Sequence, residues 1–196
     1  MVNCSKLEIL DVRKNRFTGQ FFKYVIYLQK LHVLSVGYNK FYGNIKGIIN
    51  LTKLHILDLS NNELGGKIPL DLQRLNAFSI NVSQWTFDQI MNYILYNEIE
   101  IDIKRREYNL SYILPTESIF DLFHNNFTGE IPVSIGSLRS LRLLNLSWNQ
   151  LEGKISASLG RISTLEQLDL AKNNLYGEIP QTLQLIKLGS CELFLQ

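Results

Sequence analysis

The sequence is poor in the features that mark membrane spans, secretion signals and charge-driven binding. No run of about 18 apolar residues occurs, so no membrane-spanning helix is expected within the chain. The first residues lack a basic region followed by an apolar run, so no signal peptide is expected in them either. A net charge of +2 is close to neutral and provides no electrostatic footprint for nucleic acid or an anionic membrane surface.

Catalytic patterns are equally scarce. The three histidines, His32, His55 and His124, have neither metal-ligand spacing nor paired cysteines near them. No G-x-S-x-G elbow or phosphate-binding loop occurs, and Gly65-Gly66 belongs to a turn that recurs along the chain. We therefore expect a protein without catalytic activity, bound metal or cofactor.

The sequence does contain internal repetition. One phrase, LRLLNLSWNQLEGKISASLGRIST, begins at Leu141, and a second copy, LEQLDLAKNNLYGEIPQTLQLIKL, follows directly at Leu165. The asparagine of this phrase recurs at Asn15, Asn39, Asn62, Asn125, Asn149 and Asn173, and its glycine recurs four positions after each of them. Repetition at such a period is typical of a stacked array, because one phrase is too short to bury its own apolar face.

One long gap divides the chain into parts. Successive asparagines are separated evenly except between Asn62 and Asn125, where the spacing equals one repeat and 39 further residues. The gap predicts three repeats, one insertion and three more repeats. The expected boundaries are repeats 1–3 at 1–77, the insertion at 78–116, repeats 4–6 at 117–188 and a degenerate tail at 189–196.

Each repeat predicts one strand followed by a turn. The L-x-L pair alternates apolar and polar residues, so Leu57 and Leu59 are expected in the core and Asp58 and Ser60 on a solvated face. The strands should stack in parallel, one per repeat. The asparagine that follows each strand is expected to bind main-chain groups of the turn that would otherwise lack partners. The fold class is thus an α/β repeat solenoid.

The motif L-x-x-L-x-L-x-x-N-x-L-x-G-x-I-P resembles the plant-specific class of leucine-rich repeat. The match is clearest in NELGGKIP, NNFTGEIP and NNLYGEIP. This class builds the extracellular regions of plant receptor-like proteins, receptor-like kinases and polygalacturonase-inhibiting proteins. The resemblance implies a right-handed superhelix, or horseshoe arc, with a parallel sheet on its concave side. It also implies a longer parent protein on the extracellular face of the plasma membrane.

The insertion at 78–116 is the sharpest functional lead. Apolar residues at helical spacing predict a short amphipathic helix over 87–95, and alternation over 99–103 predicts a strand. The segment resembles the island of plant receptor-like proteins and of the brassinosteroid and phytosulfokine receptors, which folds against the inner face of the horseshoe. The alternative is a tolerated loop without a ligand. Candidate ligand-binding residues in the insertion are Tyr96, Arg105, Arg106 and Tyr108.

Aromatic residues also occupy polar positions of the repeat. The position before the asparagine holds Tyr38, His124 and Trp148, and the position before that holds Phe123. An exposed aromatic cluster on the concave face indicates a contact site. The alternative is that the insertion itself covers these rings, and the two interpretations are compatible.

Six N-x-S/T sequons favour a secreted, glycosylated protein. The repeat's own asparagine and serine positions offer a second explanation for their number. The candidate glycosylation sites are Asn3, Asn50, Asn81, Asn109, Asn126 and Asn145.

The resemblance implies a ligand-recognition module of a cell-surface receptor-like protein. The island and the concave face are expected to bind an extracellular peptide or small-molecule ligand, and residues 117–186 to dock a co-receptor kinase ectodomain. The alternatives are a secreted enzyme inhibitor, which the island disfavours, and a truncated, non-functional remnant.

Overall fold

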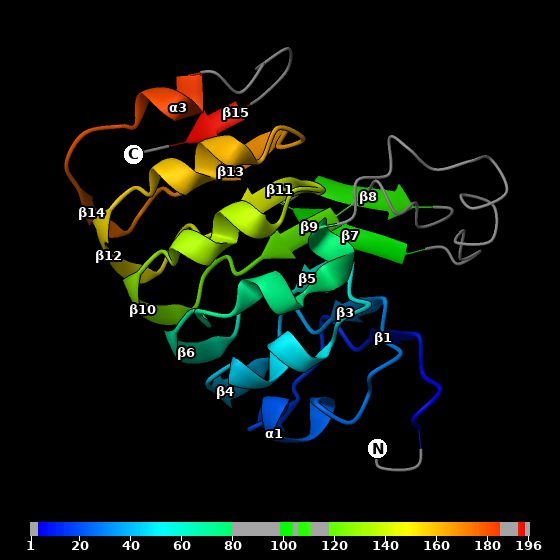
Figure 1. Cartoon of the computed structure of the whole chain (residues 1–196). Helices are drawn as coiled ribbons and strands as arrows, with labels where there is room; N and C mark the ends of the chain where they lie inside the picture. Colours follow the sequence, from blue (N-terminus) through cyan, green and yellow to red (C-terminus); the bar gives the residue numbers. More distant parts are fainter. Residues whose placement is uncertain (1–3, 80–98, 104–105, 111–117, 185–191, 195–196) are drawn as a thin grey trace, which may run out of the picture.

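The computed structural model describes residues 4–79, 99–103, 106–110, 118–184 and 192–194. For 99–103, 106–110, 184 and 192–194 it describes the backbone. Figure 1 shows the repeats stacked side by side in a curved array, with the first repeat at one end and the sixth near the other. Successive repeats add one strand each to the same sheets, because every repeat has the same alternation of apolar and polar residues.

The first sheet contains seven parallel strands in chain order, apart from the strands of the insertion. They are β1 (Ile9–Asp11), β3 (Val33–Ser35), β5 (Ile56–Asp58), β9 (Ser118–Asp121), β11 (Leu141–Asn145), β13 (Gln167–Asp169) and β15 (Glu192–Phe194). β5 and β9 pair directly, with Leu57 opposite Phe120 and Asp58 opposite Asp121. The insertion therefore leaves the stacking of repeats 3 and 4 intact.

A second parallel sheet and a row of short helices complete each repeat. The sheet has the order β14 (Asn174–Tyr176), β12 (Gln150–Lys154), β10 (Asn126–Glu130), β6 (Glu63–Lys67), β4 (Lys40–Gly43) and β2 (Thr18–Gly19). The helical turns are α1 (Phe22–Val25), η1 (Lys46–Asn50), η2 (Leu72–Arg74), η3 (Asn76–Ser79), η5 (Val133–Ser137), η6 (Ala157–Arg161) and α3 (Gln181–Gln184). In Figure 1 these turns run along the opposite side of the array from the first sheet.

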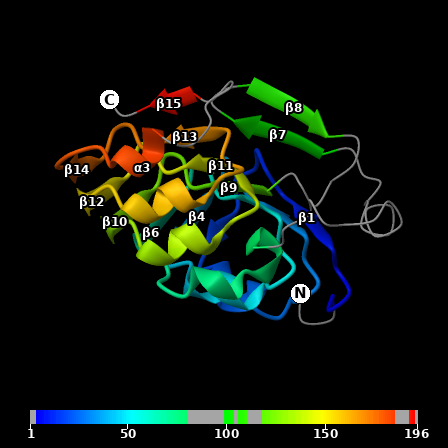
Figure 2. The same ribbon diagram turned by 45° about the horizontal axis from the view of Figure 1, so that its top comes forward.

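The insertion contributes an antiparallel hairpin. Strand β7 (Ile99–Ile103) confirms the strand expected from the sequence, and it pairs with β8 (Arg106–Leu110), which the sequence did not predict. Figures 1 and 2 both place this hairpin beside β9 and β11 of the first sheet. The helix expected over 87–95 lies outside the described residues.

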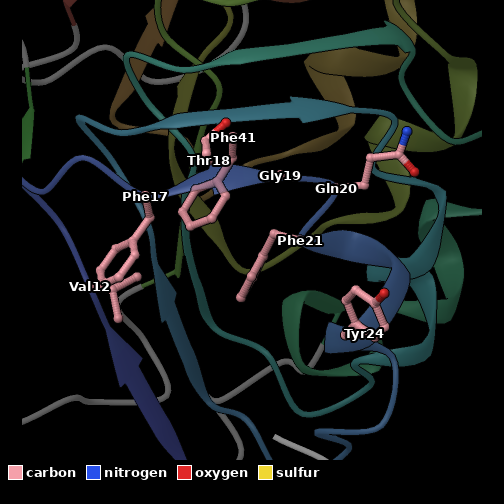
Figure 3. Close-up of a pocket in the computed structure, with 8 residues that line it drawn as sticks. All are labelled: Val12, Phe17, Thr18, Gly19, Gln20, Phe21, Tyr24 and Phe41. Carbon is pink, nitrogen blue, oxygen red and sulfur yellow. The ribbon is translucent and has the colours of Figure 1, made fainter.

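The core is one continuous apolar cluster that passes through all the repeats. Leu31, Leu34 and Val36 of repeat 2 are fully buried, whereas the equivalent Leu7, Leu10 and Val12 of repeat 1 are half-buried. This difference arises because β1 and β2 are the outermost strands of their sheets. An apolar groove of 530 Å³ opens at this end, and Figure 3 shows the aromatic rings of Phe17, Phe21 and Tyr24 around it.

The repeat asparagines connect one repeat to the next. Asn149 Nδ2 donates to Leu146 O at 3.1 Å, to Ser147 O at 3.2 Å and to Leu122 O of the preceding repeat at 3.0 Å. Its Oδ1 accepts from Phe127 N at 3.0 Å. The three carbonyl groups lie where the chain leaves the first sheet, and Phe127 N lies in β10 of the second sheet, so one buried side chain satisfies main-chain groups of two repeats. The same pattern of bonds recurs at Asn39, Asn62, Asn125 and Asn173.

Candidate ligand-binding face of the first sheet

The concave face of the first sheet consists of rows that run from repeat to repeat. Side chains alternate across a strand, so residues between the core positions point to this face. Three rows are distinguished. The apolar row is Ile9, Val33, Ile56, Ile119 and Leu143; the carboxyl row is Asp11, Ser35, Asp58, Asp121, Asn145 and Asp169; and the turn column is Lys14, Tyr38, Asn61, His124, Trp148 and Lys172.

Apart from the half-buried Ile9, the apolar row is buried although it lies outside the core. Val33 and Ile56 are fully buried, Ile119 and Leu143 are nearly so, and together they form a cluster separate from the core. Next to them the rings of His32 and His55 stack with centroids 5.7 Å apart. Burial lowers the pKa of His55 to about 4, so this side chain is neutral near pH 7. The half of the face where the strands begin is therefore covered.

Apart from the exposed Asp11, the carboxyl row is buried as well, so the solvated face expected for Asp58 and Ser60 was wrong. Both are 1% exposed. Asp58 Oδ2 accepts from Ser35 Oγ at 2.7 Å, and its Oδ1 accepts from Ser60 N at 3.0 Å and Ser60 Oγ at 2.7 Å. Burial raises the pKa of Asp58, while burial and the neighbouring Asp58 carboxyl raise the pKa of Asp121 well above its usual range. Alternation correctly assigned the direction of these side chains, but it does not report what packs over them.

Asn145 replaces a carboxyl in this row and makes two of the three bonds that Asp58 makes. Its Oδ1 accepts from Ser147 N at 3.1 Å and Ser147 Oγ at 2.7 Å. Asn145 is 1% exposed, and its Nδ2, to which a glycan would be attached, is buried. The burial of this nitrogen disfavours the predicted glycosylation of Asn145, because it leaves no room for a glycan.

The structure describes the side chains of two of the other sequons, Asn50 and Asn126. Asn126 is exposed at the start of β10, and Asn50 is half-buried, with its Nδ2 donating to Gly47 O at 3.3 Å. Asn109 lies in β8, and Asn3 and Asn81 lie outside the described residues. Among the sequons whose side chains the structure describes, Asn126 is thus the exposed one.

The turn column has one unusual backbone conformation at all six positions. Its φ angles lie between 50° and 57°, in the left-handed region that side chains other than glycine seldom adopt. At this point the chain leaves the first sheet and turns toward the second. Main-chain bonds hold each turn against the next: Asn125 N donates to Trp148 O at 3.1 Å and Asn149 N donates to Lys172 O at 3.2 Å. The column is therefore rigidly spaced along the array.

Three candidate residues from the sequence meet in this column and beside it. The rings of Phe123 and His124 lie 5.8 Å apart, and those of His124 and Trp148 lie 5.9 Å apart at 81°. Trp148 is 51% exposed, His124 is exposed and Phe123 is half-buried. We call these three residues the aromatic cluster. Its surface is open, in contrast to the apolar row and most of the carboxyl row.

The structure adds Asn61 to the cluster. His124 Nδ1 lies 3.0 Å from Asn61 Oδ1, and because a carbonyl oxygen only accepts, the histidine donates through Nδ1. This contact joins repeats 3 and 4 across the insertion. The sequence could have indicated Asn61, because it occupies the same position of the repeat as His124 and Trp148. Tyr38 occupies this position in repeat 2, one step further along the turn column.

The remaining candidates belong to the insertion. Arg106 and Tyr108 lie in β8, on the hairpin beside β9 and β11, while Tyr96 and Arg105 lie outside the described residues. Among the described residues, no three His, Cys, Asp or Glu side chains gather in a group that could hold a metal ion.

A leucine-rich-repeat family model matches this chain at residues 53–75, 118–138, 140–162 and 164–193. Receptor-like protein 41 of Arabidopsis thaliana is 34% identical over 154 residues, which cover 71% of this chain and 18% of that protein. The chain belongs to the plant leucine-rich-repeat receptor-like proteins. It spans less than a fifth of the length of this relative.

Solved ectodomains of plant receptor kinases share the fold of this receptor-like chain. The GASSHO1/SCHENGEN3 ectodomain of Arabidopsis thaliana, in complex with CASPARIAN STRIP INTEGRITY FACTOR 2, has a TM-score of 0.61 and 31% identity over 99% of this chain and 22% of its own. The Arabidopsis receptor kinase HAESA, in complex with the peptide hormone IDA and the co-receptor SERK1, has a TM-score of 0.57 and 26% identity over 97% of this chain and 30% of its own. No described helix of the receptor-like chain is long and apolar enough to cross a membrane.

Proposed function

We propose that this chain is a non-catalytic recognition module, displayed by its parent protein on the extracellular face of the plasma membrane. The observation that carries the proposal is the exposed aromatic cluster of Phe123, His124 and Trp148 on a face that is otherwise largely closed. Its ligand is an extracellular peptide or small molecule. The solved complexes of similar ectodomains with CASPARIAN STRIP INTEGRITY FACTOR 2 and with IDA support a binding role.

The geometry suits recognition for two physical reasons. Aromatic side chains bury a large area and lose little conformational entropy on binding, because they have only two rotatable bonds. The cluster is also built on a sheet whose turns are tied together by the repeat asparagines, so it is held in place before the ligand arrives. A ring or aliphatic group of the ligand therefore packs against Trp148 without reorganising the protein.

The insertion at 78–116 forms the second wall of the ligand site in this proposal. Support comes from the position of the β7–β8 hairpin beside β9 and β11, the strands that lead to His124 and Trp148. Tyr96, Arg105, Arg106 and Tyr108 are its proposed ligand contacts. Removing 80–116 from the full-length parent, which keeps the buried Phe78 of the core, is expected to abolish ligand binding and preserve the fold, since β5 and β9 pair directly. Retained affinity in the deletion variant would contradict this wall.

Repeats 4–6 are the proposed docking surface for a co-receptor kinase ectodomain. The complex of HAESA with IDA and SERK1 supports this arrangement for an array of the same fold. Adding the purified SERK1 ectodomain to the ligand-loaded parent and following association by interferometry tests it directly. If the two proteins fail to associate at micromolar concentration, the docking proposal is wrong.

The aromatic cluster is tested by a pair of aromatic-to-alanine variants. Trp148→Ala is expected to lower the affinity for extended synthetic octapeptides at least tenfold, because it removes the most exposed anchor of the site. Tyr176→Ala removes a ring that is 63% exposed at β14, away from the turn column, and should bind like the wild type. Equal affinities of the two variants would contradict the proposal.

A further inference from the structure

Among the side chains that the structure describes, the turn column has one exposed charge beyond the aromatic cluster. From His124 to the end of the turn column the only charged member is Lys172, which is exposed and follows Trp148. The next position after each asparagine, at the start of the second sheet, holds the uncharged Asn126, Gln150 and Asn174 in these repeats. A ligand that extends from the cluster along this part of the turn column therefore meets the positive charge of Lys172.

The acidic residues that these repeats contribute to the carboxyl row are buried. Asp121 is 1% exposed and Asp169 is 8% exposed, and Asn145 stands between them in the carboxyl row. Glu166 lies at the beginning of its strand, where it forms an ion pair with Arg142 at 3.0 Å. The carboxylates of the row are therefore not accessible to a ligand that contacts Lys172. In repeat 3 the position after the asparagine holds the exposed Glu63, but this residue lies on the other side of His124.

The spacing of the column sets a distance for the ligand. Neighbouring strands of a sheet lie about 4.8 Å apart, so Lys172 stands roughly one step from Trp148 and two steps from His124. The main-chain bonds from Asn125 to Trp148 and from Asn149 to Lys172 maintain these steps. An extended peptide rises about 3.3 Å per residue, and two to three residues therefore span the distance from the rings to the lysine.

We propose that the ligand is an extended acidic peptide, whose aromatic or proline ring packs on Trp148 and His124 and whose carboxylate, two to three residues away, pairs with Lys172. This inference rests on the proposed recognition function and defines its substrate class. The carboxylate contact is exposed, so its contribution is modest and sensitive to salt. The ring provides most of the affinity and the lysine selects the sign of the neighbouring charge.

A series of synthetic octapeptides tests this assignment. Each peptide carries one tyrosine and, at an offset of one to five residues, an aspartate, an asparagine or a lysine in a background of glycine and serine. Binding of each peptide to the wild-type chain is followed by interferometry. At offsets of two and three the aspartate peptides are expected to bind about two- to fivefold more tightly than the asparagine peptides. The advantage should fall as the salt concentration rises.

Variants of Lys172 separate this inference from the proposed function. Lys172→Gln should abolish the preference for aspartate, and Lys172→Glu should transfer it to the lysine peptides. A wild type that binds aspartate and asparagine peptides equally, while Trp148→Ala still loses binding by interferometry, overturns the acidic ligand and leaves the recognition site in place. If no peptide binds the wild type, or if Trp148→Ala binds every peptide as the wild type does, both proposals are wrong.

Discussion

The carboxyl row and the turn column lie on the same face of the same sheet, close together in each repeat. Asp58 and Asp121 in the row are buried, whereas His124 and Trp148 in the column are exposed. The carboxyl row has extended backbone, and its polar groups bond to neighbouring strands. The turn column has left-handed backbone, and it lies where the chain leaves the first sheet. Stability and recognition are thus assigned to adjacent positions of one repeat.

The comparison predicts that changes at buried polar positions alter stability and that changes in the column alter binding. The largest expected effect is at the asparagine next to the column. Asn149→Ala orphans main-chain groups in two repeats and should lower the free energy of unfolding by about 1–3 kcal/mol. Denaturant unfolding followed by circular dichroism measures this loss.

Asn15→Ala is the matched control for that variant. Asn15 is exposed and donates to Val12 O and Arg13 O of its own repeat. Water can replace these bonds, so the change should cost less than Asn149→Ala. If Asn149→Ala leaves the free energy of unfolding unchanged, the repeat asparagines do not stabilise the array as proposed.

The second prediction concerns the pair of carboxyls that join repeats 3 and 4. The pKa of Asp121 is raised, so the folded protein retains a proton that the unfolded chain has already lost. Its contribution to stability is therefore greatest at low pH and declines as pH rises from about 3.8 through the folded-state pKa. Asp121→Asn should stabilise the protein by roughly 1 kcal/mol at pH 8, and the gain should shrink as the pH falls toward 4.

Two controls sharpen this prediction. The pKa of His55 is lowered, so its contribution to the stability of the protein is lost as pH falls from about 6.5 toward 4, opposite to that of Asp121. The variant and the wild type must therefore be compared at each pH. Asn145→Asp adds a carboxyl beside Asp121 and should destabilise the protein most at pH 8. The prediction fails if the effect of Asp121→Asn is independent of pH.

The third prediction concerns a residue that is expected to affect binding and not stability. Trp148→Ala should change the free energy of unfolding by less than about 0.5 kcal/mol, because the side chain is 51% exposed. Thermal and denaturant unfolding measure this, on the same samples used for peptide binding. A loss as large as that expected for Asn149→Ala would show that the ring has a structural role and would weaken the division between row and column.

The smallest expected effect on the fold comes from the sequons. In the parent protein secreted from plant cells, we propose that Asn126 carries a glycan and Asn145 does not, since the first is exposed and the second is buried. Asn126→Gln should remove one glycan in mass spectrometry and leave unfolding unchanged. A glycosylated Asn145 peptide would contradict the closed carboxyl row.

Much of the architecture was predictable from the sequence because the repeat is strict. Its nearly constant period identified the core positions, the strand of each repeat and the neighbours in each column, and the strand over 99–103 was also correct. β8 was not predicted because its segment, Arg106–Leu110, lacks clear alternation. The contact of His124 with Asn61 was also missed, since a polar residue at a polar position attracts no notice.

The sequence by itself determined which residues share a row, because alternation along a strand and a nearly constant period fix the direction and the neighbours of each side chain. Only the tertiary structure decided which of these rows are buried and which are exposed to solvent. Asp58 and Trp148 both point away from the core, yet one is buried and the other is 51% exposed. The physical reason is that exposure depends on groups contributed by other repeats and by segments distant in the sequence. The pattern of a single strand does not encode these groups.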